Sequence, residues 1–86
     1  MIIYKYYLVI TDTQSLNLPE DAQILSVAEQ NGELCLWALV IPDNPKTYRT
    51  FEILGTGNPI PKTLRRKFIG TVPMESFMWH VFERLN

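Results

Sequence analysis

The sequence predicts an all-β domain, built as a small antiparallel sandwich or a partly open barrel of six or seven strands. Runs rich in Ile, Tyr and Val recur at short intervals and are separated by Pro, Gly, Asn and Asp, while no segment reads convincingly as a helix. The strongest local signal is Asn31-Gly32. Both residues tolerate the positive φ of a type I′ turn, so they predict a central hairpin.

Size and composition indicate one globular domain over residues 1–86. Hydrophobic residues make up 47% of the sequence and the net charge is −1, which argues against disorder and against a nucleic-acid binder, since such binders carry a basic excess. A chain of this size buries only about 60% of its unfolded surface, and one cysteine allows no internal disulfide. Association with a second copy would bury more apolar surface, so we expect a homo-oligomer, with a dimer favoured.

The N-terminal run MIIYKYYLVI is apolar but lacks the basic leader and the small-residue cleavage site of a secretory signal. It is also too short to span a membrane, which needs about 20 apolar residues. We therefore expect no membrane partner and a cytoplasmic location.

Two strands are expected before the hairpin. Ile2–Ile10 places apolar or aromatic side chains at every even position, which predicts a strand with that face buried. Gln14–Leu18 alternates more weakly and stops at Pro19, which cannot donate a hydrogen bond to a ladder. This segment is expected to form a short edge strand.

The central hairpin spans Gln23–Ile41, and its two-residue turn sets which residues face each other. The expected pairs are Gln30 with Glu33, Val27 with Leu36, and Leu25 with Ala38. The second arm, Leu34–Ile41, is apolar at odd and even positions alike. That pattern is typical of a central strand covered on both faces.

Three more strands are expected in the C-terminal half. They are Thr47–Leu54, Phe68–Val72 and Phe77–Leu85, separated by loops at Pro42–Pro45 and Gly55–Pro61 and by a turn at Pro73–Ser76. Gly70 indicates a bulge or a close backbone approach. The last segment has a short helix as its alternative, but its aromatic residues and Val81 favour a strand.

One candidate ligand site is the loop from Gly55 to Pro61 with the cations that follow it. Glycines let backbone N–H groups approach a phosphate, but this loop lacks the Gly-Lys-Ser/Thr of a P-loop and leads into no helix. We favour a wide turn in which both glycines supply unusual φ values, followed by a solvated basic segment. The residues that would contact a nucleotide or an acidic partner are Gly55, Gly57, Asn58, Lys62, Arg65 and Arg66.

No catalytic residue, metal site or cofactor is predicted. A catalytic histidine needs a positioned partner, and the sequence contains no Gly-x-Ser-x-Gly elbow that would supply a nucleophile for His80. Cys35 lies in the most buried strand, where a thiol is usually inert. Neither residue has the clustered ligands of a metal site. The chain is therefore expected not to be an enzyme.

Tyrosine and tryptophan are more numerous than a core this small can enclose. Both are favoured at interfaces, because they bury a large area at a small cost in entropy. We therefore expect an interface, and its residues are Cys35, Trp37, Leu39, Trp79 and His80. The alternative is an ordinary core with scattered aromatics on the surface.

Three segments together resemble a family of small phage and prophage proteins with no assigned activity. They are LWALV at 36–40, GTGNPI at 55–60 and WHVFE at 79–83, within a resemblance that covers roughly residues 10–83. Because that family has no known activity, no site residue can be transferred from it. The resemblance implies a small accessory protein in the cytoplasm of a bacterial host.

Three functions follow as expectations. The first is a non-enzymatic binding module that occupies a host protein, for instance a defence protein. The second is an oligomeric nucleotide or small-ligand binder that uses the loop from Gly55 to Pro61 with Lys62 or Arg65. The third is a structural component of the virion.

Overall fold

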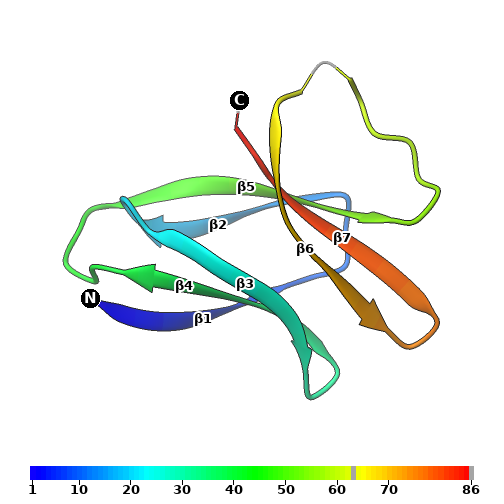
Figure 1. The fold of residues 1–86 in the computed structure, drawn as a ribbon. Helices are drawn as coiled ribbons and strands as arrows, with labels where there is room; N and C mark the ends of the chain where they lie inside the picture. The colour runs from blue at the N-terminus through cyan, green and yellow to red at the C-terminus, as the bar shows by residue number, and fades with distance from the viewer. Residues whose placement is uncertain (63, 86) are drawn as a thin grey trace.

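The computed structural model describes residues 1–62 and 64–85, and in these ranges the chain forms seven antiparallel strands and no helix (Figure 1). The strands are β1 (Ile2–Leu8), β2 (Thr13–Pro19), β3 (Gln23–Gln30), β4 (Glu33–Val40), β5 (Lys46–Gly55), β6 (Arg66–Met74) and β7 (Phe77–Arg84). The all-β prediction is confirmed, and the arrangement is a sandwich rather than a closed barrel. The final segment is a strand, as its composition favoured.

Two sheets make up the sandwich. The first has the order β1-β4-β3, and the second has the order β2-β5-β7-β6. Their edge strands β3 and β6 pack against each other and close one side of the sandwich, while β1 lies at the far edge of the first sheet (Figure 1). The predicted edge strand before Pro19 is confirmed as β2.

The core lies between the sheets and follows from the alternation of side chains along each strand. From the first sheet, the even positions of β4 point inward. From the second sheet, alternate residues of β5, β6 and β7 meet them. The large buried side chains of this core are Leu18, Leu34, Leu36, Val40, Phe51, Ile53, Val72 and Val81, with Leu18 supplied by β2.

The Asn31-Gly32 turn forms as predicted, with φ of 54° and 81° at its two residues. The expected pairs Gln30–Glu33 and Val27–Leu36 are also confirmed. The third expected pair is wrong, because Ile24 and not Leu25 lies opposite Ala38. Leu25 is the extra residue of a β-bulge, which shifts the register by one and turns Ile24 toward the core.

Two burial expectations hold only in part. The even positions of β1 do share the inward side of β4, but Ile2 and Tyr4 are 48% and 38% exposed because the second sheet does not cover them. Strand β4 is central, and no strand of the described residues packs on its outward side, although Cys35 on that side is buried. On its outward side Trp37 and Leu39 remain partly exposed.

The glycines near the second sheet have different roles. Gly57 has φ of 91°, as the loop prediction required, but Gly55 has no positive φ. A Cβ on Gly55 would lie 3.2 Å from Asn58 Nδ2 and 3.3 Å from the Trp79 ring, so a side chain there would fit only if these neighbours shifted slightly. The bulge expected near Gly70 is confirmed between Phe68 and Gly70. The C-terminal turn is shorter than predicted, because β6 continues to Met74.

Candidate functional site

The outward side of the first sheet carries an apolar surface, which we call the Trp37 face. Its members are Ile3, Tyr7, Cys35, Trp37 and Leu39, placed on one side by the register of β1 and β4. Ile3 and Tyr7 are more than half exposed, and no other strand of the described chain packs over them. The Trp37 face is therefore an uncovered sheet surface with a tryptophan at its centre.

Cys35 belongs to the Trp37 face but is fully buried. The Lys5 ammonium lies 5.0 Å from the centre of the Tyr7 ring and donates a hydrogen bond to Gln30 Oε1 at 2.8 Å. Lys5 is on β1 and Gln30 is on β3, so this side chain crosses β4 near Cys35. Of the predicted interface residues on this sheet, Trp37 and Leu39 are accessible to a partner and the thiol is not.

Trp79 and His80 lie on the other sheet and point to opposite sides of β7. Trp79 packs against the core and stacks on Phe77, with ring centroids 5.6 Å apart. His80 lies between two hydroxyls, with Nε2 2.8 Å from Thr56 Oγ1 and Nδ1 2.9 Å from Thr71 Oγ1. The five residues predicted for one interface therefore do not form a single surface.

The contacts of His80 bear on any chemistry it could perform. Both of its ring nitrogens are held by threonine hydroxyls, which act as neutral partners and not as activating carboxylates. Among residues 1–62 and 64–85, no group of three His, Cys, Asp or Glu side chains is placed to hold a metal ion. The arrangement around His80 suits a structural role that ties β6 and the Thr56 turn to β7.

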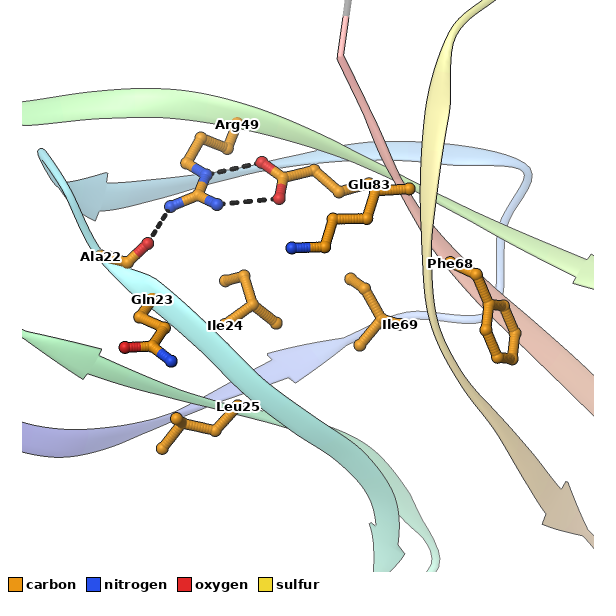
Figure 2. A pocket seen from close by; sticks show the side chains of 9 residues that line it. Ala22, Gln23, Ile24, Leu25, Arg49, Phe68, Ile69 and Glu83 are labelled. Atoms are coloured by element: carbon orange, nitrogen blue, oxygen red, sulfur yellow. Dashed lines mark hydrogen bonds and ion pairs between the residues drawn. The ribbon is translucent and has the colours of Figure 1, made fainter.

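A cavity of about 360 Å³ opens between β3 and β6, and an ion pair lies in its wall (Figure 2). Arg49 Nε and Nη2 donate to the two carboxylate oxygens of Glu83 at 2.6 and 2.8 Å, and Arg49 Nη1 donates to the Ala22 carbonyl. Ile24 and Ile69 form the apolar part of the lining. This bidentate pair links β5 and β7 to the residue before β3, on the side of the sandwich where β3 and β6 pack together.

The sequence analysis did not identify the Arg49–Glu83 pair. A signal was present, because Glu83 shares the inward parity of β7 with Val81 and Trp79. A carboxylate in an inward row needs a buried cation. What parity alone did not supply was the pairing of β5 with β7, which brings Arg49 within reach.

A second buried carboxylate lies on the outward side of the second sheet. Glu52 accepts hydrogen bonds from Arg66 Nε at 2.7 Å and from Arg84 Nη2 at 2.8 Å. Burial by itself raises the pKa of Glu52, but the hydrogen bonds and charges of the two guanidinium groups outweigh it and hold the pKa below its ordinary value of 4.5. Arg66 thus serves as an internal partner and not as the solvated loop cation that we expected.

Of the residues predicted to bind a ligand, Gly55 and Asn58 line one cavity of about 400 Å³, whereas Arg66 is bonded to Glu52. Asn58 also lines a cavity of about 470 Å³ beside Glu52 and Arg84, and its backbone N–H closes a turn onto the Gly55 carbonyl at 3.1 Å. Lys62 is exposed, and the backbone carbonyl of Arg65 accepts a hydrogen bond from Leu85 at 2.9 Å. Thr63, within the same basic run, lies outside the described residues. The loop forms a turn as we favoured, but only Gly57 and not Gly55 supplies the positive φ.

Comparisons with known proteins give a family and no activity. A family model described as a domain of unknown function (DUF7352) matches residues 1–86. No curated protein and no solved structure matches the chain. None of the described residues belongs to a helix that is long and apolar enough to cross a membrane.

Proposed function

The chain belongs to DUF7352, a domain of unknown function, and we propose that it acts as a non-enzymatic binding module whose contact surface is the Trp37 face. The observation that carries the proposal is the partly exposed Trp37 at the centre of an uncovered sheet face. Tryptophan residues in such positions contribute strongly to binding, because a partner can desolvate a large rigid ring at a small entropic cost.

The character of the Trp37 face indicates the kind of partner. The charged side chain that crosses it is Lys5, and its ammonium is already held by Gln30 and the Tyr7 ring. Ile3, Trp37 and Leu39 then offer an apolar contact with little charge. Such a surface suits the apolar patch of another protein more than a nucleotide or a nucleic acid.

The setting is proposed from the sequence. The LWALV, GTGNPI and WHVFE segments resemble small phage and prophage proteins, which supports a bacterial host protein as the partner. Occupying that protein, for instance a defence protein, requires no catalytic group. It requires only an accessible contact surface such as the Trp37 face.

Affinity purification from the lysate of the natural host tests the proposal with three forms of the protein. These are the wild type, Trp37→Ser on the Trp37 face, and Tyr48→Ser on the second sheet as the control, since Tyr48 is 73% exposed. We expect one partner to be recovered in near-stoichiometric amount by the wild type and by Tyr48→Ser. Trp37→Ser should bind it at least about 30-fold more weakly, the loss typical of a central aromatic residue.

The proposal would be contradicted if the recovered partner bound all three forms equally, or if the wild type recovered no specific partner. Circular dichroism of Trp37→Ser must show the wild-type β spectrum, so that a loss of binding reports on the surface and not on folding.

A further inference from the structure

The free edge of β1 is the least protected sheet edge in the described chain. Strand β1 pairs with β4 on one side and has no strand on the other. An unpaired edge presents a row of backbone N–H and C=O groups that can pair with another strand. Exposed apolar side chains accompany this row, namely Ile2, Ile3, Tyr4 and Tyr7, with Val9 and Ile10 just beyond the strand.

The other three edges carry features that block such pairing. Strands β3 and β6 are both bulged and pack against each other, so closely that a Cβ on Gly70 would lie 2.9 Å from Val27 Cγ2. Strand β6 also contains Pro73 and begins with two cations. Strand β2 has polar residues at its odd positions and ends at Pro19. Bulges, prolines and edge charges are the usual devices against edge-to-edge association.

Strand β1 has none of these devices in an effective form. It contains no proline and no register shift along Ile2–Leu8. Its charged residue, Lys5, lies over the Tyr7 ring and donates to Gln30, so its charge sits on one side of the sheet and does not block the backbone groups of the free edge. A strand of seven residues whose free edge is unprotected and largely apolar is suited to pairing with another strand.

We propose that β1 pairs antiparallel with β1 of a second copy of this chain, across a two-fold axis that passes beside Tyr4. The two three-stranded sheets then join into one continuous sheet, and the Trp37 faces of both copies lie on the same side of it. The proposal concerns the backbone edge of β1, which shares Ile3 and Tyr7 with the Trp37 face, and it holds with or without partner binding.

A second copy fits this edge because identical antiparallel strands satisfy each other about a two-fold axis. The axis at Tyr4 places Ile3 of each copy opposite Lys5 of the other. An axis at Lys5 would instead set two like charges directly opposite, which is unfavourable. Ile2 and Tyr4, which the second sheet leaves exposed, also gain cover from the new strand.

The contact is modest in size, so we expect a reversible dimer. A seven-residue strand is about 24 Å long, and a sheet with its side chains is about 10 Å thick. A contact of these dimensions buries less surface than a standard protein–protein interface of about 1,600 Å². Sedimentation velocity from about 1 μM to 1 mM should therefore show a monomer that converts to a dimer as concentration rises.

Charge changes at Ile3 test the register. Ile3→Lys places a cation opposite the partner's Lys5 at two symmetric positions, and we expect the dimer dissociation constant to rise by about tenfold or more. Ile3→Glu places an anion there instead, so the dimer should persist with the wild-type constant or a lower one. Tyr48→Lys on the second sheet serves as the control and should behave as the wild type.

A cysteine at the axis gives an independent test. Tyr4→Cys places two thiols opposite each other, with Cβ atoms about 5 Å apart, so mild oxidation should produce a disulfide-linked dimer. Tyr48→Cys, at a position that is 73% exposed against 38% for Tyr4, should remain monomeric on a non-reducing gel. The native Cys35 is buried and does not compete.

Three results would overturn the edge pairing. One is a wild type that stays monomeric up to about 1 mM. Another is a dimer that both Ile3→Lys and Ile3→Glu dissociate, as stacking of the Trp37 faces would predict. The third is Tyr4→Cys cross-linking no faster than Tyr48→Cys. Partner binding is measured separately with Trp37→Ser, which leaves the β1 edge unchanged, so the two proposals fail independently.

Discussion

The two outer faces of the sandwich differ in how their side chains are satisfied. On the second sheet, Glu52 is held by two arginines, His80 by two threonines, and Ser15 Oγ lies 3.2 Å from Thr50 Oγ1. Its exposed Phe68 packs edge to face on Phe82, with centroids 5.4 Å apart. On the first sheet, Ile3, Trp37 and Leu39 have no covering element in the described chain.

This difference separates stability from recognition. Polar groups that form hydrogen bonds within the chain contribute to folding and leave few donors or acceptors for a partner to satisfy. Apolar groups on an uncovered sheet face stay in contact with water, so covering them with another surface is favourable. Changes on the second sheet should therefore lower stability, whereas changes on the Trp37 face should alter association.

The largest loss of stability is expected for Glu52→Gln. The change leaves the guanidinium groups of Arg66 and Arg84 in a mostly buried site without their carboxylate. Removing one partner of a buried ion pair typically costs about 3 kcal/mol. Urea unfolding at neutral pH measures this, with Glu33→Gln, an exposed position, as the control that should change little.

The same residue predicts a dependence on pH. Because Arg66 and Arg84 hold the pKa of Glu52 below 4.5, its ionised form stabilises the fold fully above pH 4.5, and this stabilisation is lost as the pH falls through the lowered pKa. The gap in unfolding free energy between the wild type and Glu52→Gln should thus narrow at about pH 3. A gap that stays constant would show that the ion pairs do not contribute.

A smaller loss is expected where the two sheets meet at their edges. In Gly70→Ala the new methyl group would lie 2.9 Å from Val27 Cγ2, so either the Val27 side chain shifts or β3 and β6 move apart. Such overpacking typically costs about 2 kcal/mol. Thermal unfolding should show the loss, and Gly70→Ala combined with Val27→Ala should recover part of it. No recovery would mean that the strain lies elsewhere.

The smallest effect on stability is expected on the Trp37 face. Trp37→Ser removes a partly exposed ring from an uncovered surface, so the unfolding free energy of the monomer should change by about 1 kcal/mol or less. Urea unfolding under dilute, monomeric conditions measures it. A loss as large as that of Glu52→Gln would remove the distinction between the two faces.

Much of the fold could be predicted because its signals are local. Asn31-Gly32 needs positive φ at both residues, and that need is met whatever surrounds the turn. Pro19 ends an edge strand because it has no N–H to donate. The bulge before Gly70 was also expected, since glycine within a strand pattern marks a bulge or a close approach.

The candidate sites could be predicted less well, because they depend on which strands become neighbours. Trp79 and His80 are adjacent in sequence but point into the core and to the outside, on a sheet that does not contain Trp37. From the sequence, Arg66 was predicted to be a solvated loop cation. It is instead a partner of Glu52, because β6 pairs with β7 and β7 pairs with β5. Such pairings join residues far apart along the chain.

The sequence by itself determined the β character, the central hairpin and the apolar character of both sides of β4. These follow from backbone preferences and from side-chain parity, which act over a few residues. The tertiary structure alone decided that β4 is covered on one side, that three sheet edges are protected, and that the edge of β1 is open. Whether a sheet face is buried and whether a sheet edge is shielded both depend on the neighbouring strands, and those neighbours are set only when the chain folds.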